Sequence, residues 1–278
     1  MSPSRLNADL HIHTHFSDSS LSPQDVVTQA YQNDIHCLAI TDHDTVAGIA
    51  PTMELAKEYD IEVIPAIELS SCYHNKDIHI LGYGFDYENI DIIEQFNVMQ
   101  RERVTRMALM IEKLKAVGID NITLDEVRSL ACSDSVGRPH LARILKRKKW
   151  VKSLKEAFIR FLDEQGIAYV PKYKLSPKEA IDLIRKANGV AVLAHPMITR
   201  VDELIPRFVE DGLDGLEVYY PNISNTIIRH YTKITQKYGM ILTGGSDAHG
   251  EGKDTTFIGK IKLPYENVVQ LKNRISQR

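Results

Sequence analysis

The chain has 278 residues, of which 43% are hydrophobic and 26% charged, and its formal net charge at neutral pH is -3. This length suits one α/β barrel or two small domains, and the apolar content is ample for a core. The slightly acidic balance argues against a protein held on nucleic acid by bulk electrostatics, although a local basic patch could still bind phosphates.

Nothing in the sequence indicates export or membrane insertion. The N-terminal residues lack the apolar stretch of a secretory signal, and no later run approaches the roughly 18 apolar residues that span a bilayer. We therefore expect a cytoplasmic protein with no membrane contact and no obligate protein partner. Cys37, Cys72 and Cys132 are widely spaced without a CxxC pair, which indicates neither a disulfide framework nor a thiolate zinc site.

The first part of the chain alternates between strands and helices. Residues 8–13 read as a strand, and Ser22 and Pro23 are suited to the N-cap and first position of a helix. Further strands are predicted at 37–43, 61–69 and 78–83, with a helix at 48–59.

Residues 97–176 have a helical pattern instead, with predicted helices at 100–117, 123–131, 139–148 and 154–163. The alternation then resumes, with strands at 190–195, 213–219 and 240–244 and helices at 202–211, 225–238 and 265–276. Alternation of this kind predicts a mainly parallel sheet or barrel. We expect residues 1–96 and 177–278 to form one barrel, capped by a helical insertion over 97–176.

The first candidate site is the run Asp9-Leu10-His11-Ile12-His13. On a strand, His11 and His13 project from the same face, as two ligands of one metal ion must. Taken alone the pattern is weak, because a strand with two solvent-facing histidines would look the same.

Further histidines and carboxylates accompany the other predicted strands. They are Thr41-Asp42-His43-Asp44, Glu68, His79, Ala194-His195-Pro196 and Gly245-Ser246-Asp247-Ala248-His249. Parallel α/β barrels build their sites at the C-terminal ends of their strands, so clusters at several strand ends indicate one shared metal site. Such a site explains why an apolar strand ends on His195, a polar group that is otherwise costly to bury.

Together the motifs DLHIHTHFSD, TDHDT, Glu68, AHP and GSDAH resemble the PHP (polymerase and histidinol phosphatase) family over nearly the whole chain. The opening motif, the insertion run Gly137-Arg138-Pro139-His140 and the tail are similar to its TrpH-type branch. Characterised members of that branch are 3',5'-nucleoside bisphosphate phosphatases and 5'-3' exoribonucleases. The resemblance implies a distorted (β/α)7 barrel with a helical insertion, and two or three bound divalent metal ions.

Carried over by position, the resemblance implies three metal subsites. Their ligands would be His11, His13, Glu68 and Asp247 for the first, Glu68, His79 and His195 for the second, and Asp18, His43 and His249 for the third. A carboxylate such as Glu68 can bridge two cations, whereas a neutral imidazole cannot. Mixed imidazole and carboxylate ligation fits Mn²⁺, Fe²⁺ or Zn²⁺, and the resemblance favours Mn²⁺.

The same resemblance implies hydrolysis of a phosphate ester. Metal ions would lower the pKa of a bridging water, so that hydroxide attacks phosphorus in line and no protein nucleophile is required. Glu68, His43 and Asp247 are the predicted catalytic residues. Asp42 and Asp44 flank His43 and could orient a ligating imidazole or protonate a leaving group.

Candidate substrate-binding residues lie in the insertion. Arg138 and His140 stand where the TrpH-type branch holds substrate phosphate, although Gly-Arg-Pro-His could equally begin a helix. Arg103 and Arg106 could reach a second phosphate from one helix face, although such charges more often form a solvated face. Residues 169–172 could line the cleft.

The leading hypothesis is a phosphoesterase that removes the 3'-phosphate of nucleoside 3',5'-bisphosphates and trims short 5'-phosphorylated RNA from its 5' end. Both activities need a pocket that binds a 5'-phosphate and cleaves at the neighbouring 3' oxygen. A histidinol-phosphate phosphatase is the alternative within the family, and the helical insertion argues against it. A non-catalytic metal- or nucleic-acid-binding module is the alternative of another class, and the complete set of ligand types argues against that.

Overall fold

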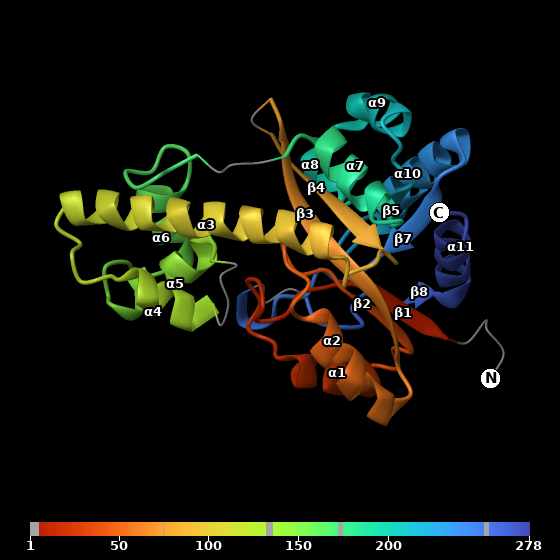
Figure 1. Ribbon diagram of the computed structural model, residues 1–278, viewed down its shortest axis with the longest axis horizontal. Coiled ribbons are helices and arrows are strands. Elements are labelled where there is room, and N and C mark those ends of the chain that lie inside the picture. Colours follow the sequence, from red (N-terminus) through yellow and green to blue (C-terminus); the bar gives the residue numbers. More distant parts are fainter. Residues whose placement is uncertain (1–5, 75, 132–135, 172–174, 253–255) are drawn as a thin grey trace.

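A sheet of eight strands forms the centre of the computed structural model, which describes residues 6–74, 76–131, 136–171, 175–252 and 256–278. The strand order is β7-β6-β5-β4-β3-β2-β1-β8 (Figure 1). The strands are β1 Asn7–Ile12, β2 Cys37–Ile40, β3 Glu62–Tyr73, β4 Lys76–Tyr83, β5 Val190–Leu193, β6 Gly215–Tyr219, β7 Ile241–Gly244 and β8 Leu263–Pro264.

The segment that follows β7 returns to β1 and nearly closes the sheet into a barrel. Asp247 donates its backbone N–H to the His11 carbonyl at 2.7 Å, and His13 donates to the Ala248 carbonyl at 3.1 Å. Gly245 permits this approach, because a Cβ at that position would overlap the backbone of His11. β8 pairs antiparallel with β1. The predicted barrel fold is therefore confirmed.

The direction of β4 differs from a purely parallel arrangement. β4 runs antiparallel to both neighbours, β3 and β5, whereas β1, β2 and β3 are parallel to one another, as are β5, β6 and β7. Only residues 74 and 75 separate β3 from β4 in the chain, and so short a connection allows only an antiparallel pair. β3 also continues to Tyr73, so Glu68 lies within the strand instead of at its end.

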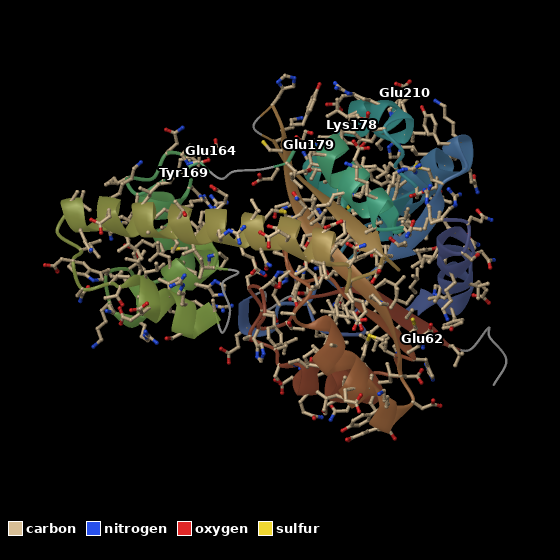
Figure 2. All side chains as sticks on the ribbon, in the orientation of Figure 1. Glu62, Glu164, Tyr169, Lys178, Glu179 and Glu210 are labelled. Carbon is tan, nitrogen blue, oxygen red and sulfur yellow. The ribbon has the colours of Figure 1, made fainter. Side chains whose placement is uncertain are left out.

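Helices surround the barrel. They are α1 Pro23–Gln32, α2 Ile49–Ala56, α7 Pro177–Lys186, α8 Pro196–Thr199, α9 Ile205–Glu210, α10 Asn225–Tyr238 and α11 Tyr265–Ile275. Ser22 caps α1 as predicted, in a reciprocal capping box with Asp25. α7 begins with the same device, formed by Ser176 and Glu179 (Figure 2).

The insertion forms a second lobe with its own hydrophobic core. Its helices are α3 Ile90–Ala116, α4 Leu124–Ala131, α5 Arg138–Arg147 and α6 Leu154–Ala157, which continues into the π-helical turn Phe158–Leu162. α3 begins at Ile90, well before the predicted start at Gln100, because Asn89 caps it. Its first turns pack on the barrel through Phe96 and its later turns on the insertion core through Met110.

No helix in the described part of the chain is long and apolar enough to cross a membrane. The thiols of Cys37 and Cys72 are both free. Cys132 and Lys172 lie outside the described residues.

Candidate metal centre and substrate cavity

Glu68 lies at the centre of the histidine cluster. Ring nitrogens of five histidines approach its two carboxylate oxygens. The distances are 2.7 Å for His79, 3.1 Å for His13, 3.2 Å for His11, 3.3 Å for His195 and 3.4 Å for His43. The Glu68 side chain is only 1% exposed, so its charge must be balanced by these groups or by a cation.

The other two predicted carboxylates extend the cluster on one side. Asp247 Oδ1 lies 3.4 Å from His13 Nε2 and 3.3 Å from His249 Nδ1, and Asp18 Oδ1 lies 3.1 Å from His249 Nε2. All nine residues predicted as ligands are therefore brought together, although they come from seven separate parts of the chain. They are His11, His13, Asp18, His43, Glu68, His79, His195, Asp247 and His249.

The donor atoms form three overlapping groups, in each of which they lie within 4.8 Å of one another. These are His11, His13 and Glu68; His43, Glu68 and His79; and His13, Asp18, His43 and His249. His13 and His43 each belong to two groups, but a neutral imidazole has only one free lone pair and so serves one cation. The resemblance assigns His13 to the first cation and His43 to the third.

Loops beyond the strand ends hold several of these residues in unusual backbone conformations. β2 ends at Ile40 and β5 at Leu193, so His43 and His195 lie in loops instead of ending strands. His195, Asp247 and Asp44 have φ angles of +31°, +49° and +54°. Such left-handed conformations are uncommon outside glycine and cluster at functional sites.

Glu217 on β6 orients two of the histidines. It is fully buried, its Oε1 lies 2.9 Å from His11 Nδ1, and its Oε2 accepts the backbone N–H of His195 at 2.8 Å. A carboxylate on the far nitrogen of a ligating histidine fixes the ring and its tautomer. Sequence reasoning missed Glu217, although a charged residue within the strand Gly215–Tyr219 was a usable signal.

Electrostatics within the cluster are strongly perturbed. Burial opposes protonation of His11, but the carboxylates of Glu217, Glu68 and Asp247 outweigh it and raise its pKa well above the usual range. For Asp9, burial disfavours the charged carboxylate and raises its pKa to about 6. This effect outweighs the backbone N–H groups of Gly259 and Ser246, which donate to Asp9 and lower its pKa. Sequence reasoning missed this role of Asp9, which ties β1 to the segment carrying Asp247.

The residues present fit divalent cations. His11 Nε2 and His13 Nε2 lie 3.1 Å apart and both face Glu68, an arrangement in which one shared cation satisfies every lone pair. Among the described residues, Nδ1 of His13 and Nδ1 of His195 are also buried without a hydrogen-bond partner. Imidazole and carboxylate donors without thiolate match Mn²⁺, Fe²⁺ or Zn²⁺ equally well.

Asp42 and Asp44 each accept hydrogen bonds from groups around the cluster, and their predicted roles beside a ligating imidazole or a leaving group stay predictions. Asp42 accepts the backbone N–H of Thr14 at 2.7 Å and the hydroxyl of Ser17 at 2.5 Å, so it holds the loop that carries Asp18. Asp44 accepts the backbone N–H of Ser70 at 2.8 Å and Nε of Arg103 at 2.9 Å. These two carboxylates therefore position a loop and an arginine.

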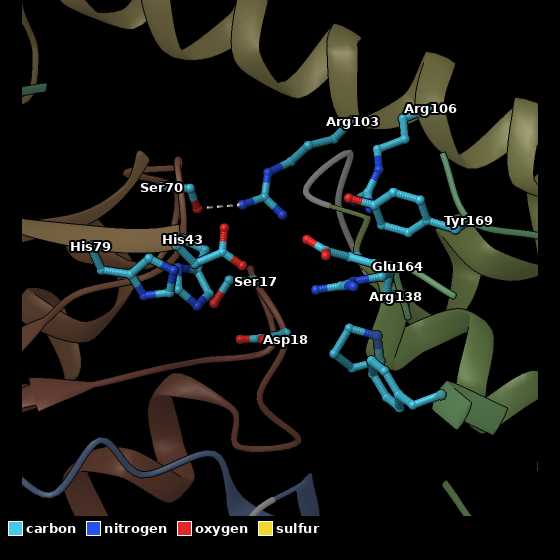
Figure 3. A pocket seen from close by; sticks show the side chains of 14 residues that line it. Ser17, Asp18, His43, Ser70, His79, Arg103, Arg106, Arg138, Glu164 and Tyr169 are labelled. Atoms are coloured by element: carbon cyan, nitrogen blue, oxygen red, sulfur yellow. Dashed lines mark hydrogen bonds between the residues drawn. The ribbon is translucent and has the colours of Figure 1, made fainter. Parts of the chain in front are cut away.

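A cavity of about 210 Å³ adjoins the cluster (Figure 3). Asp18, His43 and His79 line it on the barrel side. Arg103, Arg106 and Arg138 line it on the insertion side, together with Phe158, Glu164 and Tyr169. Burial, together with the nearby charges of Arg138 and Arg103, lowers the pKa of Arg106 to about 10. Three guanidinium groups gathered around one cavity favour an anionic ligand.

Backbone and side-chain contacts hold the three arginines in the cavity wall. Arg103 donates to Asp44 and to Ser70 Oγ at 3.2 Å, Arg106 Nε donates to the Val170 carbonyl at 2.7 Å, and Arg138 donates to the Leu162 carbonyl at 3.3 Å. Arg103 and Arg106 thus face the cavity and do not form a solvated helix face. Tyr169 lines the same cavity, as expected for the run that contains it.

His140 has a different position from the arginines. It is buried behind the cavity wall, and its Nδ1 accepts the backbone N–H of Gly137 at 3.0 Å, in the manner of a capping box. Burial lowers its pKa to about 4, so the ring is neutral at pH 7. The run Gly-Arg-Pro-His therefore begins α5 and places Arg138, but not His140, in the lining of the cavity.

The chain belongs to the PHP domain family, whose sequence model matches residues 9–243. The 5'-3' exoribonuclease Rnm of Escherichia coli strain K12 is 32% identical over 87% of this chain and 84% of its own length. The 3',5'-nucleoside bisphosphate phosphatase of Chromobacterium violaceum is 28% identical over 91% of this chain and 90% of its own. A solved structure from Bifidobacterium adolescentis, described as a metal-dependent phosphoesterase, has a TM-score of 0.87 at 30% identity, covering 97% of this chain and 96% of that one.

Proposed function

We propose that this protein is a metal-dependent hydrolase of phosphate esters that acts on nucleotides. Its substrates would be nucleoside 3',5'-bisphosphates, from which it removes the 3'-phosphate, and short 5'-phosphorylated RNA, which it shortens in the 5'-3' direction. The observation that carries this proposal is the position of three arginines across one cavity from the His and carboxylate cluster. Relatives named for both activities support it.

The nine clustered residues, from His11 to His249, would hold two or three divalent cations, with Glu68 as the bridging ligand. Bound cations supply a water of lowered pKa and offset the charge on phosphoryl oxygens. We favour Mn²⁺, with Fe²⁺ and Zn²⁺ as alternatives, on the family resemblance. We assign the central catalytic roles to Glu68, which faces five ring nitrogens, to His43, which lines the cavity, and to Asp247, which lies beside His13 and His249.

The chain's own part in the reaction is to bind and orient the two phosphates. Arg106 and Arg138 would bind the 5'-phosphate, since both lie on the insertion side of the cavity. Arg103 lies nearer the cluster, hydrogen-bonded to Ser70 and Asp44, and would contact the substrate between its two phosphates. The scissile 3'-phosphate would then lie beside His43, His79 and Asp18. Fixing both ends of the substrate lowers the entropic part of the barrier.

The test is phosphate release or RNA shortening by metal-stripped protein supplied with Mn²⁺. Adenosine 3',5'-bisphosphate and a 5'-phosphorylated RNA trimer are expected to react, and 5'-AMP is not, because it lacks an ester at the 3' oxygen. Hydrolysis of histidinol phosphate alone would replace this proposal with the family's other phosphatase activity. No hydrolysis of any of these would favour the non-catalytic module.

A further inference from the structure

The loop that carries Asp18 is held from two sides. On the barrel side, Asp42 accepts hydrogen bonds from Thr14 and Ser17. On the insertion side, Arg143 Nη2 donates to the Asp18 carbonyl at 3.2 Å. Five of the other eight candidate ligands lie on barrel strands or within two residues of one. Asp18 depends on a loop whose position the insertion helps to set.

A second residue of the same insertion helix, His140, lies near this loop. The ring of His140 lies close enough to the backbone of Ser17 and to the Asp18 carboxylate for both to raise its pKa, against the larger effect of burial. Its Nδ1 accepts the Gly137 N–H, so the proton of the neutral ring is on Nε2. The hydrogen bond from α5 to the loop is the one that Arg143 donates to the Asp18 carbonyl.

α5 also reaches the proposed phosphate end of the cavity. Arg138 is its first residue and lines the cavity, whereas Arg143 lies about one and a half turns further along the helix. Between and beyond them, Leu141, Ile144 and Leu145 are fully buried in the insertion core. A helix fixed in this way moves as a unit, so a shift at Arg138 is transmitted to the Asp18 loop.

We propose that α5 couples nucleotide binding to one metal subsite. Arg143 acts as the positioning residue that holds Asp18, so a 5'-phosphate on Arg138 raises the affinity of the subsite of Asp18, His43 and His249 for its cation. By linkage, that cation raises the affinity for the nucleotide by the same factor. The identity of the anion rests on the proposed function, whereas the hold of α5 on Asp18 rests on the Arg143 hydrogen bond.

The first experiment is a calorimetric titration of metal-stripped protein with Mn²⁺. Arg143→Ala is expected to weaken one class of sites by about tenfold to 100-fold, the usual cost of losing a group that supports a metal ligand. The remaining sites should keep their affinity, and Arg143→Lys, which can still donate to a carbonyl, should restore part of the loss. Arg147→Ala is the matched control. Arg147 lies on the same helix, but its side chain is exposed, and its Nη2 is 3.9 Å from Glu126 Oε1, which is too far for a hydrogen bond.

The coupling itself is measured by repeating the titration with saturating 5'-AMP, and with adenosine as the control that lacks a phosphate. The wild-type protein should bind its weakest Mn²⁺ more tightly with 5'-AMP than with adenosine, and Arg143→Ala should abolish that difference. Unchanged Mn²⁺ binding in Arg143→Ala, equal weakening at every site, or an undiminished 5'-AMP effect would each overturn the proposal. Hydrolysis of the substrate panel is scored separately, so the proposed function and this coupling can fail independently.

Discussion

At the scale of single residues, the position of Glu68 decides how the metal cluster responds to change. Its two oxygens face five imidazoles from different strands and loops. We expect the Glu68→Gln protein to bind at least one cation fewer. Its activity should fall by more than the tenfold to 100-fold that is typical when a residue supporting a ligand is replaced. Metal analysis of the purified variant and its turnover of adenosine 3',5'-bisphosphate would check this. Near-normal metal content and turnover would show that Glu68 bridges nothing.

Glu217 acts one step away from the proposed cations, through His11 and His195. Glu217→Gln should weaken Mn²⁺ binding by about tenfold to 100-fold, while KM measured at saturating Mn²⁺ stays close to the wild-type value. Glu210→Gln is the matched control, because Glu210 is exposed on α9 (Figure 2). A Glu217→Gln protein with unaltered Mn²⁺ affinity would show that this carboxylate serves only folding.

The sequence predicted the candidate metal ligands better than it predicted the buried carboxylates that hold them in place. Histidines in apolar strand contexts pointed to a shared cluster, because such placement has few structural explanations. The family resemblance supplied the full set of nine residues, including Asp18. Glu217 and Asp9 were missed because a buried carboxylate is recognised by its partners, which lie far away in the sequence. Arg138 and His140, two residues apart, face different surroundings because the helix beginning at Arg138 turns between them.

At the scale of elements, the sequence predicted the alternation of strands and helices but not the direction or length of every strand. β4 returns antiparallel beside β3, so His79 reaches Glu68 from within a strand instead of from its end. α3 is longer than predicted, because its first turns contact the barrel and lack the periodicity of the insertion. Strand direction follows from how neighbours pair, which a single segment does not encode.

Closure of the barrel depends on a glycine. A methyl group at position 245 would overlap the β1 backbone at His11, so Gly245→Ala should push away the segment that carries Asp247 and His249. We expect a loss of about 1–3 kcal/mol in the free energy of unfolding, as for other overpacked positions. Urea unfolding in the presence of EDTA measures this without a contribution from bound metal. Wild-type stability in EDTA would mean that the closing segment adapts without strain.

At the scale of the whole molecule, the insertion supplies the arginines of the cavity and the barrel supplies the candidate metal ligands. The barrel carries eight of the nine clustered residues on strands or on the loops at their ends, and Asp18 on the loop before α1. The insertion carries all three cavity arginines. Our proposed division at residue 97 falls inside α3, which contributes Met99 to the barrel core and Met107 to the insertion core. This continuous helix fixes the position of Arg103 and Arg106 relative to the cluster.

The arginines should contribute only to substrates that carry a 5'-phosphate. Arg106→Ala is expected to lower kcat/KM for adenosine 3',5'-bisphosphate by about tenfold to 100-fold, since a hydrogen bond to a charged group is worth about 1.5–3 kcal/mol. Activity on 3'-AMP should change little. Arg101→Ala is the control on the same helix, where the side chain is exposed and paired with Glu94. Equal losses on both substrates would place Arg106 outside the 5'-phosphate site.

The most direct test of the two-phosphate cavity is the ratio of kcat/KM for adenosine 3',5'-bisphosphate to that for 3'-AMP, measured on the Mn²⁺-loaded wild-type protein. The two substrates share the scissile ester and differ only in the 5'-phosphate. Because Arg106 and Arg138 would bind that group, we predict a ratio of at least about 100. A ratio near one would contradict the account, since the cavity arginines would then take no part in recognising the substrate.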